Sequence, residues 1–171
     1  IRRLTATNMK AYSATVAAGW DSEVALEDSS LTDGKIGVAL VGQVTSRITR
    51  TTITQQQDTG LALWGGSHLV FHNNIHGNLL RQVFSQDPIE LSDTRPDAGT
   101  FGHGNYWGRS CPAALFLAGV DSNRSDVVDS HPFESPNRWS QGAKPGCPPP
   151  PAPTLNSPID GELIASGSPP L

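Results

Sequence analysis

Five histidines are the side chains of this chain that could bind a transition metal. His68, His72 and His76 follow one another at four-residue intervals, and His103 and His131 come later. An extended strand holds residues four apart at a separation of about 13 Å, which is too far for His68 and His72 to chelate one copper or zinc ion alone. We therefore interpret these histidines as solvated turn residues.

A second candidate for chemistry is a segment rich in oxygen-bearing side chains. Its potential ligands for Ca²⁺ are Asp121, Asn123, Asp126 and Asp129. Calcium loops alternate short acidic ligands in this way, although Ser125 stands where such loops usually carry an acid. A turn-rich cap held by Asx turns accounts for the same residues. Calcium is thus the one cofactor that the sequence leaves open.

An internal repeat of 22 residues must position these side chains. Two apolar columns recur at this spacing, and a polar column runs between them: Leu4, Leu26, Ile48 and Val70; Met9, Leu31, Ile53 and Ile75; Thr7, Ser29, Thr51 and Asn73. A second apolar pair follows in each unit: Val16 and Ala18, Val38 and Leu40, Leu61 and Leu63. Alternating apolar residues of this kind predict short strands with one buried face.

The repeat predicts an all-β fold, because each unit can bury its apolar face only by stacking on its neighbours. We expect a parallel β-helix of four or five coils over residues 1–100, a C-terminal cap over 101–143, and a Pro-rich linker with an extended tail over 144–171. The polar column should line a tight bend, where small side chains satisfy the backbone of the turn. The tail resembles the start of an immunoglobulin-like module.

Residues 1 to about 110 resemble the right-handed parallel β-helix repeat of pectate-lyase-like proteins. The segment Gly104-Asn105-Tyr106-Trp107-Gly108, followed by the Asp-rich stretch up to Phe133, resembles an ending found in secreted bacterial β-helix proteins, among them a periplasmic copper-binding family. This resemblance implies a right-handed solenoid and a secreted or cell-surface location. It does not assign an activity, because the fold hosts lyases, hydrolases, epimerases, adhesins and scaffolds.

In the enzymes of that family, the substrate groove follows the outward face of the strand that here carries the second apolar pair. The outward residues of that strand are Ala17, Ala39 and Ala62, followed by Gly19, Val41 and Trp64. None of them can act as a general acid or base, so we assign no catalytic residue. Trp64, with the neighbouring Lys35 and Asp58, is the candidate ligand-binding group, and Lys35 and Asp58 are expected to form a surface ion pair.

Two function classes follow from these observations. The first is a non-catalytic extracellular scaffold or glycan-associated module that binds a polysaccharide. The alternative is the C-terminal part of a carbohydrate-active enzyme, a polysaccharide lyase, glycoside hydrolase or epimerase, with its catalytic coils upstream of Ile1.

Charge and composition exclude some partners. The net charge of −4 provides no general basic field for nucleic acid, and no stretch approaches the roughly 18 apolar residues of a membrane-spanning helix. Because the chain opens on Ile1 in the middle of a coil, we expect a processed product or fragment. Its open N-terminal coil is expected to be covered by missing sequence or by self-association.

Cys111 and Cys147, the two cysteines of the chain, are predicted to form a disulfide. The bond would close a loop between the cap and the Pro-rich linker, and the chain-entropy model assigns such a loop about 3–4 kcal/mol of stabilisation. Non-reducing mass spectrometry should find both thiols protected from alkylation in the folded protein. Alkylation of both without reductant would contradict the pairing.

Overall fold

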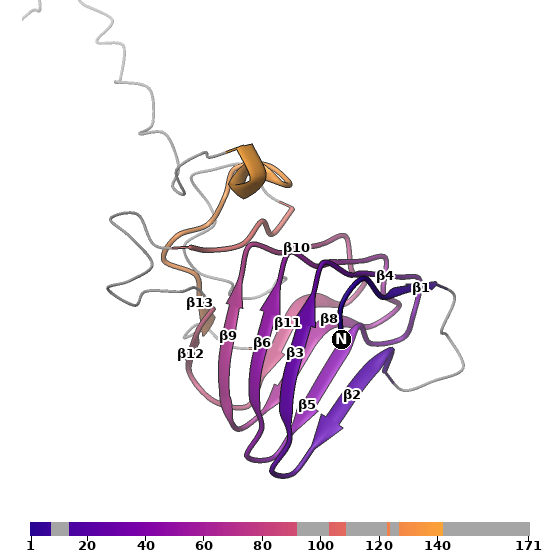
Figure 1. Cartoon of the computed structure of the whole chain (residues 1–171), viewed down its shortest axis with the longest axis vertical. Coiled ribbons are helices and arrows are strands. Elements are labelled where there is room, and N and C mark those ends of the chain that lie inside the picture. The colour runs from indigo at the N-terminus through magenta and orange to yellow at the C-terminus, as the bar shows by residue number, and fades with distance from the viewer. Residues whose placement is uncertain (8–13, 92–102, 109–122, 124–126, 142–171) are drawn as a thin grey trace, which may run out of the picture.

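The repeating apolar residues form three parallel sheets, which wrap around one core (Figure 1). The structure, a computed structural model, describes residues 1–7, 14–91, 103–108, 123 and 127–141. Sheet 1 contains β1 (Thr5–Thr7), β4 (Ser30–Thr32), β7 (Thr52–Thr54) and β10 (Asn74–His76). Sheet 2 contains β2 (Val16–Gly19), β5 (Val38–Val41), β8 (Thr59–Trp64) and β11 (Arg81–Ser85). Sheet 3 contains β3 (Glu23–Glu27), β6 (Thr45–Thr49) and β9 (Ser67–Phe71).

Successive strands along the chain belong to different sheets, so the chain traces an all-β parallel solenoid, as predicted. The expected number of four or five coils was too high, because about three coils are complete. The fourth coil stays open because β12 (Ile89–Glu90) does not continue sheet 3 beside β9. It pairs instead with β13 (Val127–Val128) from the cap region.

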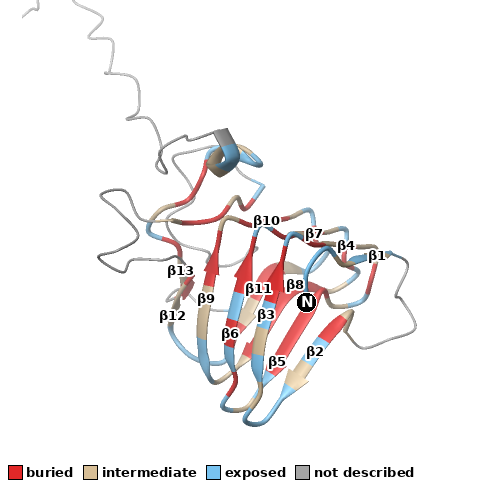
Figure 2. Ribbon diagram, in the orientation of Figure 1, coloured by how far each residue is buried: buried red, intermediate tan, exposed pale blue. Residues whose placement is uncertain are grey.

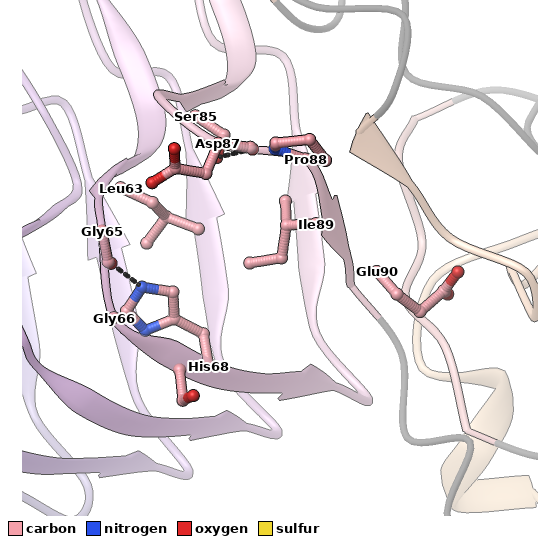
Figure 3. A pocket seen from close by; sticks show the side chains of 10 residues that line it. Leu63, Gly65, Gly66, His68, Ser85, Asp87, Pro88, Ile89 and Glu90 are labelled. Carbon is pink, nitrogen blue, oxygen red and sulfur yellow. Dashed lines mark hydrogen bonds between the residues drawn. The ribbon is translucent and has the colours of Figure 1, made fainter.

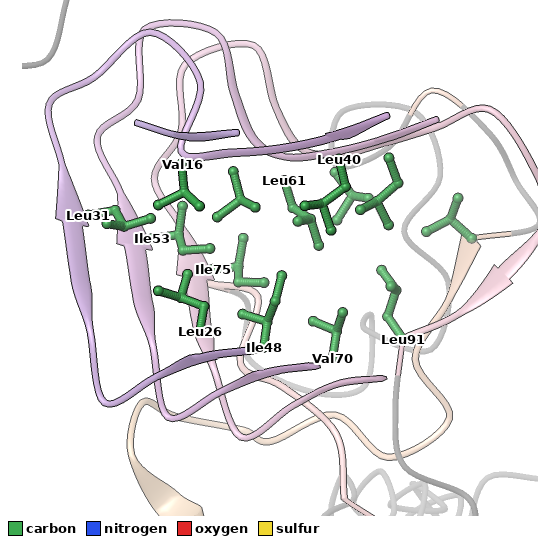
Figure 4. Close-up of a cluster of buried hydrophobic side chains, with 14 of the residues drawn as sticks. Val16, Leu26, Leu31, Leu40, Ile48, Ile53, Leu61, Val70, Ile75 and Leu91 are labelled. Atoms are coloured by element: carbon green, nitrogen blue, oxygen red, sulfur yellow. The ribbon is translucent and has the colours of Figure 1, made fainter. Parts of the chain in front are cut away.

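The core consists of apolar side chains stacked in columns. These side chains point inward from the three sheets of the solenoid (Figure 4). Leu26, Ile48 and Val70 stack in register on sheet 3 and are fully buried. Leu31, Ile53 and Ile75 form the matching column on sheet 1. Figure 2 shows these inward positions as buried and the outer positions of sheet 3 as largely exposed. Both columns confirm the predicted register for the second, third and fourth units.

The first unit does not follow the predicted spacing. Leu4 was expected in the column of Leu26, but its N–H donates to Ser29 Oγ, 25 residues further on. Ala6 pairs with Leu31, and Thr7 pairs with Thr32 rather than joining the Ser29 column. The reason is a longer connection between β1 and β2 than between β4 and β5, which shifts the first strand by three residues.

Two ladders of buried polar side chains join the coils at the ends of sheet 1. At the bend from sheet 3, Thr51 N–H donates to Asn73 Oδ1, and Asn73 N–H donates to Asn105 Oδ1. At the bend toward sheet 2, Gly34 N–H donates to Gln56 Oε1, and Gln56 N–H donates to Asn78 Oδ1. Each side chain thereby satisfies backbone groups that a buried turn would otherwise leave unpaired.

The bend from sheet 3 into sheet 1 requires an unusual backbone conformation in every coil. Arg3, Asp28, Arg50 and His72 have φ between 50° and 58°, in the left-handed region that non-glycine residues rarely adopt. Arg50 and Asp28 also form a two-pronged ion pair, with N···O distances of 2.6 Å and 2.9 Å. The bend is therefore held by the ladder inside and by charged contacts outside.

The described part of the cap continues this ladder past the last coil. Tyr106 pairs with Asn74, which places residues 105–107 beside β10. The 3₁₀ turn η2 (Arg138–Gln141) follows β13. Residues 142–171, which include all of the predicted linker and tail, lie outside the described residues.

Replacing Ile48 with Asp should unfold the solenoid, because Ile48 is fully buried between Leu26 and Val70. An unpaired charge at such a site costs several kcal/mol. Thr45→Asp, at an exposed position of the same strand, is the matched control and should leave the melting temperature nearly unchanged. Equal thermal stability of the two variants would show that the assigned register is wrong.

Candidate functional site

An aromatic stripe, defined here as Trp20, Val41, Trp64 and Phe84, crosses the outer face of sheet 2. Strand register aligns Val41 with Trp64, and it aligns Phe84 with Ala62 on the neighbouring strand. Trp20 is 73% exposed and Val41 is 41% exposed, although burying apolar surface away from water would be favourable. An exposed apolar patch of this kind marks a binding surface more often than an exposed single residue does.

Small residues in the coils determine how the aromatic rings lie. Gly42, with φ of 85°, follows Val41, and a Cβ atom at Gly42 would stand 2.9 Å from the indole of Trp20. The missing side chain thus leaves room for the Trp20 ring to lie against the next coil. Trp64 packs on Phe84 with ring centroids 5.2 Å apart, and the guanidinium of Arg81 lies 5.7 Å from the Phe84 centroid.

Two surface hollows border the stripe, and Trp64 lines both. One, of about 440 Å³, is lined by Trp20, Val41, Gln43, Gln86 and Asp87 among others. The other, of about 230 Å³, includes Asp58, Ala62, Leu80, Arg81 and Phe84. Hollows with aromatic walls and a few polar side chains are typical of ligand-binding surfaces.

The sequence-predicted ligand group is only partly assembled. Asp58 and Trp64 line the same hollow, and Lys35 lies exposed on the adjacent coil. The Asp58 N–H donates to the Lys35 carbonyl over 2.9 Å, but the Asp58 carboxylate accepts a hydrogen bond from Thr59 Oγ1. No ion pair between Lys35 and Asp58 occurs in the described structure, so that expectation was wrong. Trp20, which sequence reasoning missed, is the more exposed aromatic residue.

The predicted disulfide and two of the four predicted calcium ligands cannot be placed. Cys111, Cys147, Asp121 and Asp126 lie outside the described residues. Asn123 accepts a hydrogen bond from Ser85 N–H and donates one to Ser85 O, both 2.8 Å long. Its amide therefore ties the cap to β11. The disulfide and the calcium site both remain predictions.

Asp129, the remaining calcium candidate, is a fully buried carboxylate at the end of the polar ladder. Its Oδ2 accepts hydrogen bonds from Trp107 Nε1 and from the backbone and side-chain amides of Asn105, and its Oδ1 accepts one from His131 N–H. Burial raises the pKa of Asp129 to about 7, against the opposing effect of these four donors. The structure thus gives this residue an internal role in closing the solenoid.

Two of the histidines meet, contrary to the expectation of separate solvated turns. His72 Nε2 lies 2.8 Å from His103 Nδ1, and the His72 ring stacks on Trp139 at a centroid distance of 5.8 Å. Phe71 and Phe133 complete this aromatic cluster. The described residues contain no group of three or more His, Cys, Asp or Glu side chains suited to a metal ion. Trp139 belongs to η2, so its contacts with His72 and Phe133 dock η2 on the bend.

A polar cavity of about 240 Å³ opens where β12 departs from β9 (Figure 3). His68 lines it, with Nε2 2.7 Å from Gly65 O and Nδ1 2.8 Å from Ser46 Oγ. Because a carbonyl only accepts, Nε2 carries the proton and Nδ1 accepts from Ser46 in the neutral ring. Burial lowers the pKa of His68, which favours that neutral form. Ser46 is itself buried, and the Ser–His pair also borders a hollow of about 570 Å³ on the outer face of sheet 3.

The outer face of sheet 3 carries a cluster of arginines around one carboxylate. Glu27 is buried and accepts ion pairs from Arg2, Arg50 and Arg47 at 2.9, 3.5 and 3.9 Å. Arg50 also binds Asp28, and its hydrogen bond holds the pKa of Asp28 below its usual range. These contacts pair opposite charges on sheet 3, and the exposed aromatic residues make sheet 2 the better candidate face.

Comparisons with protein-family models, curated proteins and solved structures give no match for this chain. In the part of the chain that is described, no helix has the length and apolar character needed to cross a membrane. The assignment of function therefore depends on the geometry of sheet 2.

Stability should fall as the pH rises from about 4 to 7, because the pKa of Asp129 is raised to about 7 in the folded protein. The folded state then holds a proton that the unfolded state releases, an effect of up to about 4 kcal/mol at about 1.4 kcal/mol per pKa unit. Asp129→Asn should remove this slope in urea unfolding measured between pH 4 and 8.5. Asp21→Asn, at an exposed turn, is the control and should keep it. A wild-type slope in Asp129→Asn would contradict the assignment.

Proposed function

We propose that this chain is a non-catalytic, extracellular β-solenoid module that binds a polysaccharide on the aromatic stripe. The observation that carries the proposal is the exposed Trp20 ring beside Val41 and Trp64, bordered by the hollow of about 440 Å³. The flat C–H face of a sugar ring stacks on an indole, and this contact removes apolar surface of both partners from water. Hydroxyl groups at the ring edge remain free to bind polar side chains.

The absence of a suitable carboxylate pair on this face supports binding over cleavage. Among the residues lining the two hollows, the carboxylates are Asp58, which precedes β8, and Asp87, which follows β11. Strands of this length separate such positions by roughly 15–20 Å. Glycosidases hold their two carboxyl groups within about 5–9.5 Å of each other. These two residues are therefore too far apart to act on one bond.

The proposed location outside the cell rests on sequence features. The resemblance to secreted bacterial β-helix proteins and the predicted disulfide both favour it. The alternative, a carbohydrate-active enzyme with catalytic coils upstream of Ile1, shares the glycan partner and differs in cleavage.

Trp20→Ala should weaken polysaccharide binding about tenfold, equivalent to about 1.4 kcal/mol, because the variant loses one stacking surface. Binding is measured by affinity electrophoresis in gels that contain each of several soluble polysaccharides. Leu79→Ala, which removes an 81% exposed apolar side chain outside both hollows, is the matched control and should bind normally.

Two outcomes would overturn the proposal. Equal binding by Trp20→Ala and Leu79→Ala would remove the aromatic stripe as the site. Release of new reducing ends or of unsaturated sugars by the wild-type chain would show bond cleavage and exclude a non-catalytic module.

A further inference from the structure

The spacing of the aromatic stripe from coil to coil suits a polymer that runs along the solenoid axis. Its members come from successive coils: the Trp20 ring lies over Gly42, Trp64 belongs to the next coil, and Phe84 to the coil after that. Neighbouring strands of a sheet are about 4.8 Å apart. One pyranose ring of an extended glycan has a similar length along its chain, so successive sugars can meet successive coils.

The polar side chains beside the stripe suit hydroxyl groups. Gln43 and Gln86 line the same hollow as Trp20 and Trp64. A primary amide both donates and accepts hydrogen bonds, as a sugar hydroxyl does. Amides also discriminate little between neighbouring hydroxyls, which suits a repeating polymer.

The charges bordering the stripe disfavour an acidic polymer. The ionisable side chains that line the two hollows are Asp58, Asp87 and Arg81, which together carry more negative than positive charge. The guanidinium of Arg81 lies over the Phe84 ring. A polyuronate would bring one further negative charge for each sugar to this surface, and like charges at short range repel.

The arginines that could attract such a polymer lie on a different sheet. Arg47 belongs to β6 of sheet 3, and Arg50 follows the same strand. Both are within ion-pair distance of Glu27, and Arg50 also binds Asp28. Their charge is therefore compensated locally and does not face the stripe.

We infer that the ligand of the aromatic stripe is a neutral polysaccharide whose chain follows the solenoid axis, with about one sugar ring for each coil. The inference rests on the proposed function and adds the chemical class and the direction of the ligand. It sets this face apart from a groove for acidic sugars, which requires several cations together.

The first experiment compares neutral with acidic polymers. Mixed-linkage β-glucan, xyloglucan and galactomannan are the neutral probes, and polygalacturonate and alginate are the acidic ones, each in 20 mM and 150 mM salt. We expect at least one neutral polymer to bind tenfold more tightly than either acidic polymer, with an affinity that changes less than twofold between the two salt concentrations. Trp20→Ala should weaken this binding tenfold.

Charge is tested separately from stacking. Asp87→Asn should raise the retention of polygalacturonate at low salt, because it removes a negative charge from the lining of the larger hollow. Gln43→Ala should weaken binding of the neutral polymer without creating affinity for the acidic ones. Unchanged retention of polygalacturonate by Asp87→Asn would contradict the inference.

Chain direction is tested with oligosaccharides of the best neutral polymer. Affinity should rise with each added sugar up to three or four rings and then level off, because that number of coils supplies the stripe. A plateau at a single ring would overturn the axial arrangement.

The failures of the two proposals are distinguishable. Tighter, salt-sensitive binding of an acidic polymer that is lost in Trp20→Ala would overturn the neutral class and leave the proposed function standing. Absence of binding to every probe would overturn both. A wild-type oligomer that Trp20→Ala converts to monomer would also overturn both, since the stripe would then be an interface between copies.

Discussion

The tight bend from sheet 3 into sheet 1 is the constraint on which the rest of the solenoid depends. A left-handed residue turns the chain in each coil, and the side chain that follows it reaches back to the carbonyl two residues before itself, as with Ser29, Thr51 and Asn73. Ser29 and Asn73 also accept hydrogen bonds from the coil below. Because a buried unpaired backbone group costs free energy, any slip of one coil against the next would break this ladder at every step.

The bend from sheet 3 into sheet 1 fixes the register of the coils, and this register also determines which residues align on sheet 2. Since the coils stack without slipping, the small residues Ala39 and Ala62 align on sheet 2, and Val41 aligns with Trp64 beside them. The functional face is thus positioned by hydrogen bonds on the other side of the core. The cap completes the ladder: Asn105 Oδ1 accepts the Asn73 N–H of the last coil, and Asp129 accepts the Asn105 N–H in turn.

Sequence reasoning succeeded where each residue repeats in an identical environment. The columns of Ile48 and Ile53 could be predicted because their neighbours 22 residues away face the same core. The prediction failed where a connection changed length, as before β2, and where a contact spans a long stretch of chain. The pairing of β12 with β13 and the meeting of His72 with His103 are of the second kind. Trp20 escaped notice because it stands just after a strand, and only Gly42 on the next coil reveals where its ring can lie.

The polar ladder at the bend and the aromatic stripe on sheet 2 are formed by different residues. This separation affects how such a chain can change its length during evolution. Each coil contacts only the coils above and below it, so duplicating one internal unit of 22 residues adds a layer without altering either end. Asp129 and Trp107 would still terminate the ladder in the longer protein. The duplication would copy the outward residues of sheet 2 as well, and the surface would lengthen by one step. A solenoid of this kind can therefore acquire a longer ligand-binding face by gene duplication alone, with no redesign of its core.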